Sequence, residues 1–171
     1  MKKSGSFLLR ETMKPEIDYI VEKYKDPLFA ISFNICQSTE DAEDVLQDTF
    51  FKYYTLSKDF EHESHLKFWL IRVVINHSRD IVTSFWRKKR TNWEEYIQSL
   101  PFTEPKEQRL LEAVMVLPEK YRTVVHLYYY EEYSIQEIAG ILKKREATIK
   151  SQLHRGRKLL KQMLKEEWYD E

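Results

Sequence analysis

Glycine is scarce in this sequence, and that scarcity is the strongest constraint on the fold. The chain has 171 residues but only three glycines and five prolines. An all-β protein needs a turn about every 8–12 residues, and such turns are usually built from glycine and proline. Charged residues make up 33% of the chain, and the lysine and glutamate among them favour helices. The sequence therefore predicts an all-α fold.

Apolar residues recur at helical spacing through the first half of the chain. The pattern predicts a short helix over 14–24, and Asp26-Pro27 has the form of an N-cap and first residue of a second helix. The capping pattern Ser38–Asp41 predicts the start of a third helix. A loop is expected over 57–64 and a fourth helix over 66–86. The first half is thus predicted to be a four-helix unit.

The stretch 91–105 has two prolines and no clear period, which is typical of a linker. Beyond it, Ser134 and Glu137 have capping-box spacing at the start of a short helix. A break at 143–146 and a long basic helix follow, the pattern of a helix-turn-helix. We therefore expect two small helical domains, 1–90 and 106–171, joined by the linker 91–105.

Several classes of protein are disfavoured by what the sequence lacks. The single cysteine, Cys36, allows no internal disulfide and is expected to be a buried apolar residue in a reducing cytoplasm. No apolar run is long enough for a signal peptide or a membrane span. The five histidines lack zinc-site spacing, and no phosphate-binding glycine loop or nucleophile elbow is present. A cytoplasmic protein without a cofactor and without enzyme activity is expected.

Charge is strongly partitioned along the chain although the formal net charge is zero. Residues 40–48 hold five acids and no base, whereas 65–93 hold seven bases and one acid. Residues 143–165 hold nine bases and one acid. A chain that needed only solubility would intersperse the two signs. Each block is therefore a candidate binding surface.

The C-terminal basic block can be read as a solvated helix face or as a helix that enters a DNA groove. Ile149, Leu153, Gly156, Leu160 and Leu164 share one face, which is expected to pack inward. Gly156 in that face predicts a close approach of a neighbouring helix. The other face carries Lys, Arg, His and Ser, which can contact phosphates and base edges. The preceding helix-turn-helix pattern favours the groove-reading alternative.

The other two blocks each leave an alternative open. Basic residues mixed with aromatic residues over 65–90 could bind single-stranded nucleic acid. Aromatic residues at helical spacing are also typical of a protein core, so both interpretations stay open. On the acidic helix, Glu43, Asp44 and Asp48 could hold a metal ion. A protein-docking face with Phe51 as an apolar anchor is the more plausible use of this helix.

Taken in order, these segments resemble the extracytoplasmic-function (ECF) sigma factors, the small initiation subunits of bacterial RNA polymerase in the sigma-70 family. The resemblance rests on "STEDAEDVLQDTFFKYY", "KFWLIRVVINHSRD", "LPEKYRTVVHLYYYEEYSIQEIAGIL" and "ATIKSQLHRGRKLL". It spans about residues 15–164, with the motifs in the order that the family has them. It implies sigma region 2 over 1–90 and region 4 over 106–171.

The resemblance also implies roles for individual residues. Core polymerase binding falls on Asp44, Gln47, Asp48 and Phe51. The residues that it implies for binding and melting the promoter −10 element are Phe60, Trp69, Arg72, Asn76, Arg79, Arg87, Lys88, Lys89 and Arg90. Reading of the −35 element falls on Lys144, Arg145, Thr148, Lys150, Ser151, Gln152, His154, Arg155 and Lys158. The linker would run toward the active-site cleft or the RNA exit path of the polymerase.

Three departures from the family pattern bear on specificity. The −10 loop has no glycine, and Lys143-Lys144 replaces the usual glycine and apolar residue before the recognition helix. That replacement implies a different turn geometry or an added phosphate contact. Gln152 occupies a position where arginine is common, and glutamine is suited to adenine.

The expected function is that of a non-catalytic sigma factor that directs core polymerase to promoters. It is expected to answer an envelope or environmental stress signal and to be held by an anti-sigma factor, without insertion into a membrane. Two alternatives stay open. One is an ordinary helix-turn-helix regulator that uses only 106–168, and the other is a metal-dependent nuclease that uses Glu43, Asp44 and Asp48.

Overall fold

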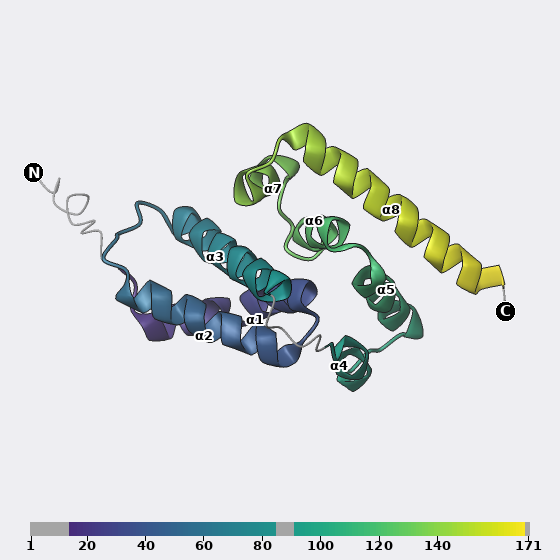
Figure 1. The fold of residues 1–171 in the computed structure, drawn as a ribbon, viewed down its shortest axis with the longest axis horizontal. Coiled ribbons are helices and arrows are strands. Elements are labelled where there is room, and N and C mark those ends of the chain that lie inside the picture. The colour runs from purple at the N-terminus through teal and green to yellow at the C-terminus, as the bar shows by residue number, and fades with distance from the viewer. Residues whose placement is uncertain (1–13, 85–90, 170–171) are drawn as a thin grey trace, which may run out of the picture.

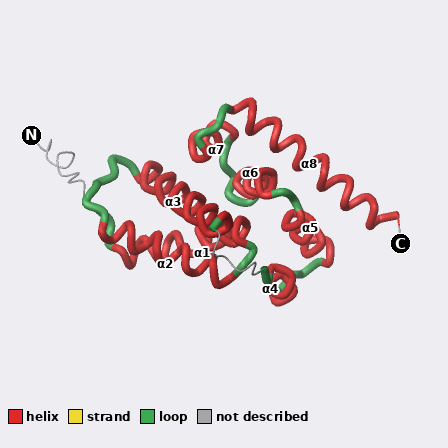
Figure 2. The backbone as a smooth tube through the Cα atoms, viewed as in Figure 1, coloured by secondary structure: helices red, strands yellow, loops and turns green. Residues whose placement is uncertain are grey.

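The computed structural model describes residues 14–84 and 91–169, and within these ranges the chain forms helices joined by loops (Figures 1 and 2). The helices are α1 (Ile17–Cys36), α2 (Thr39–Thr55), α3 (Glu63–Thr83), α4 (Trp93–Ser99), α5 (Pro105–Val116), α6 (Glu119–Tyr129), α7 (Ile135–Leu142) and α8 (Glu146–Tyr169). The all-α prediction is confirmed. Helices α1–α3 form one half of the molecule, α5–α8 form the other, and α4 lies between them (Figure 1).

Helix α1 runs without a break through Pro27, so the prediction of two helices over this stretch is wrong. A proline inside a helix removes one backbone hydrogen bond and costs about 3 kcal/mol or more. The cost is offset by burial, because Ile20, Tyr24, Leu28 and Ile31 form one continuous inner stripe across the proline. The first half therefore contains three long helices within its described residues rather than the four that were predicted.

Helices α2 and α3 complete this three-helix unit and begin close to where the sequence indicated. The Ser38 hydroxyl accepts a hydrogen bond from the Asp41 amide at the start of α2. Val45, Thr49 and Tyr53 of α2 are buried, as are Leu70, Val74 and Ile75 of α3. Cys36, at the end of α1, is buried as expected.

The segment predicted to be a linker contains the short helix α4, which the sequence reasoning did not foresee. Ile97 of α4 is fully buried and belongs to a cluster with Phe33 of α1 and Met115 of α5. Just before α4, the Asn92 side chain exchanges hydrogen bonds with Thr39 at the start of α2. The segment is thus anchored to both halves of the molecule.

The second half contains the predicted helix-turn-helix, formed by α7 and α8. Ser134 and Glu137 form the reciprocal hydrogen bonds of a capping box at the start of α7, as predicted. Helix α7 ends at Leu142, and its C-cap residue Lys143 has left-handed backbone angles of φ 52° and ψ 47°. That conformation is the one glycine usually supplies at a helix C-terminus. Lys143 therefore adopts a backbone conformation that glycine usually adopts at this position of a helix.

Substituting Lys143 and Lys144 separately tests this description of the turn. We expect Lys143→Gly to stabilise the fold by about 0.5–1 kcal/mol, because glycine removes the left-handed strain of a side-chain-bearing residue. Lys144→Gly is the matched control, since positive φ in the described residues is confined to Gln37, Glu132 and Lys143. It should destabilise by a similar amount. Urea unfolding of the two variants measures this, and equal losses in both would contradict it.

Gly156 lies where α8 crosses α6, which confirms the predicted close approach. A Cβ atom on Gly156 would lie 2.9 Å from Val125 Cγ2 and 3.5 Å from Tyr121 Cβ. The first distance is shorter than carbon atoms tolerate, and Val125 is buried and stiff about χ1. Glycine is therefore needed for this helix crossing.

The two helical glycines should respond oppositely to alanine. In Gly156→Ala, overpacking exceeds the helix-propensity gain, so we expect a net loss of about 1 kcal/mol in the free energy of unfolding. A Cβ on Gly140 of α7 would meet no atom within 4 Å. Gly140→Ala should therefore stabilise by about 0.5–1 kcal/mol. The prediction is contradicted if the Gly156 variant has the higher urea midpoint of the two.

The two halves do not stand apart in this structure. One hydrophobic cluster runs from Leu28 and Ile31 of α1 to Val124 and Leu127 of α6. Helix α1 contacts α6, and α3 contacts α7. The chain is therefore in a closed arrangement, in which each half covers part of the other.

Candidate nucleic-acid and polymerase interface

The outer face of α8 carries most of the residues expected to read the −35 element. Of the five residues predicted to pack inward, Ile149, Leu153 and Gly156 are buried, whereas Leu160 and Leu164 are half-buried. Seven of the nine expected residues are exposed: Arg145, Thr148, Lys150, Ser151, His154, Arg155 and Lys158. Helix α8 lies along one edge of the molecule (Figure 1). A basic surface of this shape can enter a major groove and contact phosphates.

The remaining two residues of this set are less accessible. Lys144 and Gln152 are half-buried, and Gln152 Oε1 is shielded from solvent and has no hydrogen-bond partner within the described residues. Arg155 is exposed but hydrogen-bonded to Tyr121, and this bond lowers the pKa of the tyrosine. The adenine preference expected of Gln152 stays a prediction.

Arg157 is a basic residue of α8 whose side chain contacts other residues of the protein. Its guanidinium lies over the rings of Tyr128 and Tyr129, 5.5 Å from each centroid. Its Nε donates a hydrogen bond of 2.5 Å to the Tyr129 hydroxyl. Arg157 therefore ties α8 to α6 and adds less to the free basic surface than the sequence indicated.

The four residues expected to bind core polymerase share the outer face of α2. Asp44, Gln47, Asp48 and Phe51 are all exposed. Phe51 has 68% of its surface in contact with solvent, and Tyr54, one turn further on, has 65%. An exposed aromatic pair among carboxylates is typical of a protein-docking site. The sequence reasoning named Phe51 but missed Tyr54, although its spacing from Phe51 could have identified it.

Four of the residues expected to hold the −10 strand line two adjoining hollows along α3. One hollow, of about 420 Å³, includes Phe60, Trp69 and Arg72 in its lining. The other, of about 560 Å³, shares Trp69 and Arg72 and adds Asn76. The Phe60 and Trp69 rings are 5.6 Å apart and tilted by 55°. Rings beside a cation are the groups on which unpaired bases stack.

The two arginines of this set within the described residues are held by the second half of the molecule. Arg72 Nη2 donates a 3.0 Å hydrogen bond to the Gly140 carbonyl oxygen of α7. Arg79 donates two bonds of 3.0 Å to one carboxylate oxygen of Glu119 in α6. In the closed arrangement these groups already have protein partners. The expected cluster Arg87, Lys88, Lys89 and Arg90 lies outside the described residues.

Arg122 is a buried residue that links the two halves by hydrogen bonds, and the sequence reasoning did not single it out. Its guanidinium donates to the Asn34 and Ile35 carbonyl oxygens at the end of α1, at 2.5 and 3.4 Å. It also donates to the Met115 and Leu117 carbonyl oxygens at 3.2 and 2.7 Å. Burial lowers the pKa of Arg122, while the nearby Glu119 carboxylate acts in the opposite direction.

The carboxylates named for a nuclease, Glu43, Asp44 and Asp48, are exposed on α2. In the described part of the chain, no group of three or more His, Cys, Asp and Glu side chains is placed to hold a metal ion. In that same part, no helix combines the length and the apolar character that crossing a bilayer requires.

Comparison with known families agrees with this division into surfaces. Sigma-70 region 2 matches residues 20–91, and Sigma-70 region 4 matches residues 107–160. Region 2 thus covers α2 and α3 with their exposed face and hollows. Region 4 covers the helix-turn-helix and most of the basic face of α8.

Individual relatives match over almost the whole chain. The ECF RNA polymerase sigma factor SigM of Bacillus subtilis (strain 168) is 31% identical over 153 residues, which cover 85% of this chain and 93% of SigM. The ECF RNA polymerase sigma factor SigW of the same strain is 28% identical over 172 residues, covering 86% of this chain and 88% of SigW.

A solved structure has the same fold at lower identity. The sigma factor RpoE of Bartonella quintana, in complex with the anti-sigma factor NepR, superposes with a TM-score of 0.66 at 23% identity. The match covers 86% of this chain and 96% of that one. With both sigma regions present in order and SigM more than 30% identical over most of its length, this chain belongs to the ECF sigma factors of the sigma-70 family.

Proposed function

We propose that this protein is the promoter-specificity subunit of a bacterial RNA polymerase, acts in the cytoplasm and has no catalytic activity of its own. The observation that carries the proposal is the presence of three chemically distinct surfaces in one small chain, of which the first two adjoin at Asp48. They are the acidic-aromatic face of α2, the hollows along α3 and the basic face of α8. Each has the chemistry for a different partner: core polymerase, melted −10 strand and −35 duplex.

In this proposal, residues 1–90 bind core polymerase and recognise the −10 element, and residues 106–171 recognise the −35 element. Residues 91–105 connect the two domains. Family membership supports this division, and so does the exposure of the relevant side chains. The closed arrangement adds a requirement. Arg72 gives one N–H group to Gly140 and Arg79 gives two to Glu119, so the full guanidinium of each becomes available to DNA only if the halves separate when the holoenzyme forms.

An anti-sigma factor is the proposed inhibitory partner. The relative RpoE was solved with the anti-sigma factor NepR, and CnrH was solved with the cytosolic domain of CnrY. An inhibitor that favours the closed arrangement would keep Arg72 and Arg79 occupied. It would thereby act without covering every DNA-binding residue.

Reconstituted transcription tests the proposal. Adding the protein to bacterial core polymerase and a broad promoter pool should yield transcripts from a distinct subset of promoters. The double variant Lys150→Ala/His154→Ala should lower those transcripts at least tenfold, because each base or phosphate contact contributes about 1–3 kcal/mol. Lys165→Ala, an exposed base near the far end of α8, is the matched control and should change little.

The possible results separate the rival functions. Tight binding of DNA by the protein without polymerase, together with no transcript, would favour an ordinary regulator. Mg²⁺-dependent DNA cleavage that Asp44→Ala abolishes would favour a nuclease. The absence of both core binding and transcripts across the pool would overturn the proposal.

A further inference from the structure

Buried polar atoms without a partner gather at the junction between the two halves. Within the described residues, five buried side-chain atoms have no hydrogen-bond partner: Asn34 Oδ1, Arg72 Nε, His126 Nε2, Tyr133 OH and Gln152 Oε1. The first four belong to residues that lie where one half meets the other. Buried polar groups in native proteins are nearly all paired, so such a concentration at one interface is unusual.

Two of these atoms lie where α3 meets the helix-turn-helix. Tyr133, just before α7, is 6% exposed, and α3 covers its ring. The Phe68 ring lies edge-on at 5.9 Å, and Lys67 Nζ is 4.9 Å from the centroid. Arg72 of α3 donates through Nη2 to the Gly140 carbonyl oxygen, but its Nε–H is shielded from solvent and unpaired among the described residues. This contact therefore buries two polar groups without a hydrogen bond.

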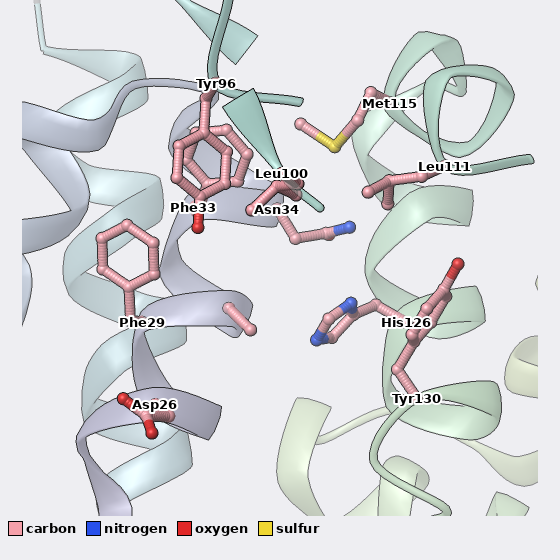
Figure 3. A pocket seen from close by; sticks show the side chains of 11 residues that line it. Asp26, Phe29, Phe33, Asn34, Tyr96, Leu100, Leu111, Met115, His126 and Tyr130 are labelled. Atoms are coloured by element: carbon pink, nitrogen blue, oxygen red, sulfur yellow. The ribbon is translucent and has the colours of Figure 1, made fainter. Parts of the chain in front are cut away.

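The other two side chains lie on either side of a cavity of about 370 Å³ between the halves (Figure 3). Asn34 belongs to α1 and His126 to α6, and both are buried. His126 Nε2 lies 3.3 Å from Glu131 Oε1, but outside hydrogen-bonding geometry. The contact between α1 and α6 thus also contains unpaired polar atoms, close to the satisfied bonds of Arg122.

Buried tyrosines within the first half are paired, unlike Tyr133. The Tyr24 hydroxyl donates to Glu63 Oε1 at 2.8 Å, and the Tyr53 hydroxyl donates to the Pro15 carbonyl oxygen at 2.7 Å. Burial raises the pKa of Tyr133, so its hydroxyl keeps its proton near pH 7. That proton has no acceptor among the described residues.

We propose that the junction is a built-in opening device, in which polar atoms left unpaired by the closed arrangement offset part of the attraction between the halves. The Arg122 bonds and the shared apolar cluster favour closure. The Tyr133 hydroxyl and the Arg72 Nε–H oppose closure, because water reaches both groups once α3 and α7 part. The closed and open arrangements are therefore close in free energy. Opening itself does not rest on the proposed function.

Single-molecule fluorescence energy transfer in the full chain measures the open fraction. Dyes are attached at Ser64→Cys in α3 and Gln136→Cys in α7, two exposed positions outside the three surfaces, with Cys36→Ala to leave no other thiol. A major population of high transfer and a minor one of lower transfer, about 1–10% of molecules, are expected. Arg122→Met removes bonds across the junction and should enlarge the minor population.

Tyr133→Phe tests the device, because it removes the unpaired hydroxyl and no hydrogen bond among the described residues. It should lower the ratio of open to closed molecules about fivefold or more and raise the urea midpoint. The comparison is made in both the wild-type and the Arg122→Met backgrounds, so that a small open fraction does not hide the effect. Tyr24→Phe is the matched control, since it removes a paired hydroxyl within the first half. It should lower the urea midpoint and leave the open fraction unchanged.

The proposal is overturned if Tyr133→Phe leaves the open fraction unchanged or increases it, since the hydroxyl would then be paired in the closed arrangement. A single population in both backgrounds would overturn it as well. The Tyr133 variant should also assemble with core polymerase about fivefold more slowly, because fewer molecules are open. This last effect alone rests on the proposed function. If the open fraction falls and the assembly rate does not, the device stands and its link to transcription fails.

Discussion

Replacing Arg122 with methionine is expected to lower the free energy of unfolding by about 2–4 kcal/mol, the largest effect on stability that we predict for a single substitution. Methionine preserves much of the side-chain volume but donates no hydrogen bond. The carbonyl oxygens of Asn34, Ile35 and Leu117 would then lose buried charge-assisted bonds. Urea unfolding measures the loss, and limited proteolysis within 91–105 reports whether the halves separate.

Arg79→Met is the matched control for this substitution. Arg79 also connects the two halves, through Glu119, but about a third of each side chain is in contact with solvent. Half-exposed ion pairs contribute little, so the loss should stay below about 1 kcal/mol. If the Arg122 variant is no less stable than the Arg79 variant, then Arg122 is not the main connection between the halves.

Phe51→Ala is expected to weaken binding to core polymerase about 30-fold. An exposed aromatic ring that becomes buried at an interface commonly contributes about 2 kcal/mol or more. Because Phe51 is largely exposed in the free protein, its removal should change the free energy of unfolding by less than about 0.5 kcal/mol. The affinity for core polymerase can be measured by competition with a labelled sigma factor.

Tyr19→Ala provides the comparison for Phe51. Tyr19 is an aromatic residue of α1 with half of its surface exposed, and it lies outside the face of α2. Its removal should leave the affinity for polymerase unchanged. Equal affinities of the Phe51 and Tyr19 variants would show that α2 does not dock through its aromatic anchor.

Much of this fold could be predicted because the signals for it are local. The inward face of α8 could be predicted because Ile149, Leu153 and Gly156 are spaced so that they lie on the same side of successive helical turns. The start of α7 follows from Ser134 and Glu137, which lie three residues apart and bond to each other's backbone. Such contacts are close in sequence, so the pattern of residue types is sufficient to find them.

The errors arose where tertiary packing overrides local preference. Pro27 usually marks a helix start, but the buried stripe on both sides of it keeps α1 continuous. Ile97 gave no periodic signal, and α4 forms because that residue is buried between the halves. Arg122 is polar within an apolar run, and nothing in the sequence predicts that two of its four carbonyl partners lie 87 and 88 positions away.

The contacts between the halves differ in how they respond to ionic strength. Arg122 binds backbone carbonyls in a dry environment, so dissolved salt hardly screens it, whereas the half-exposed pair Arg79–Glu119 is open to screening. Rising ionic strength would then weaken the contact between α3 and α6 slightly and leave the contacts at the end of α1 intact. Separation of the halves would thus begin at α3, with the Arg122 bonds among the last to break, and Arg79 would become available to DNA early.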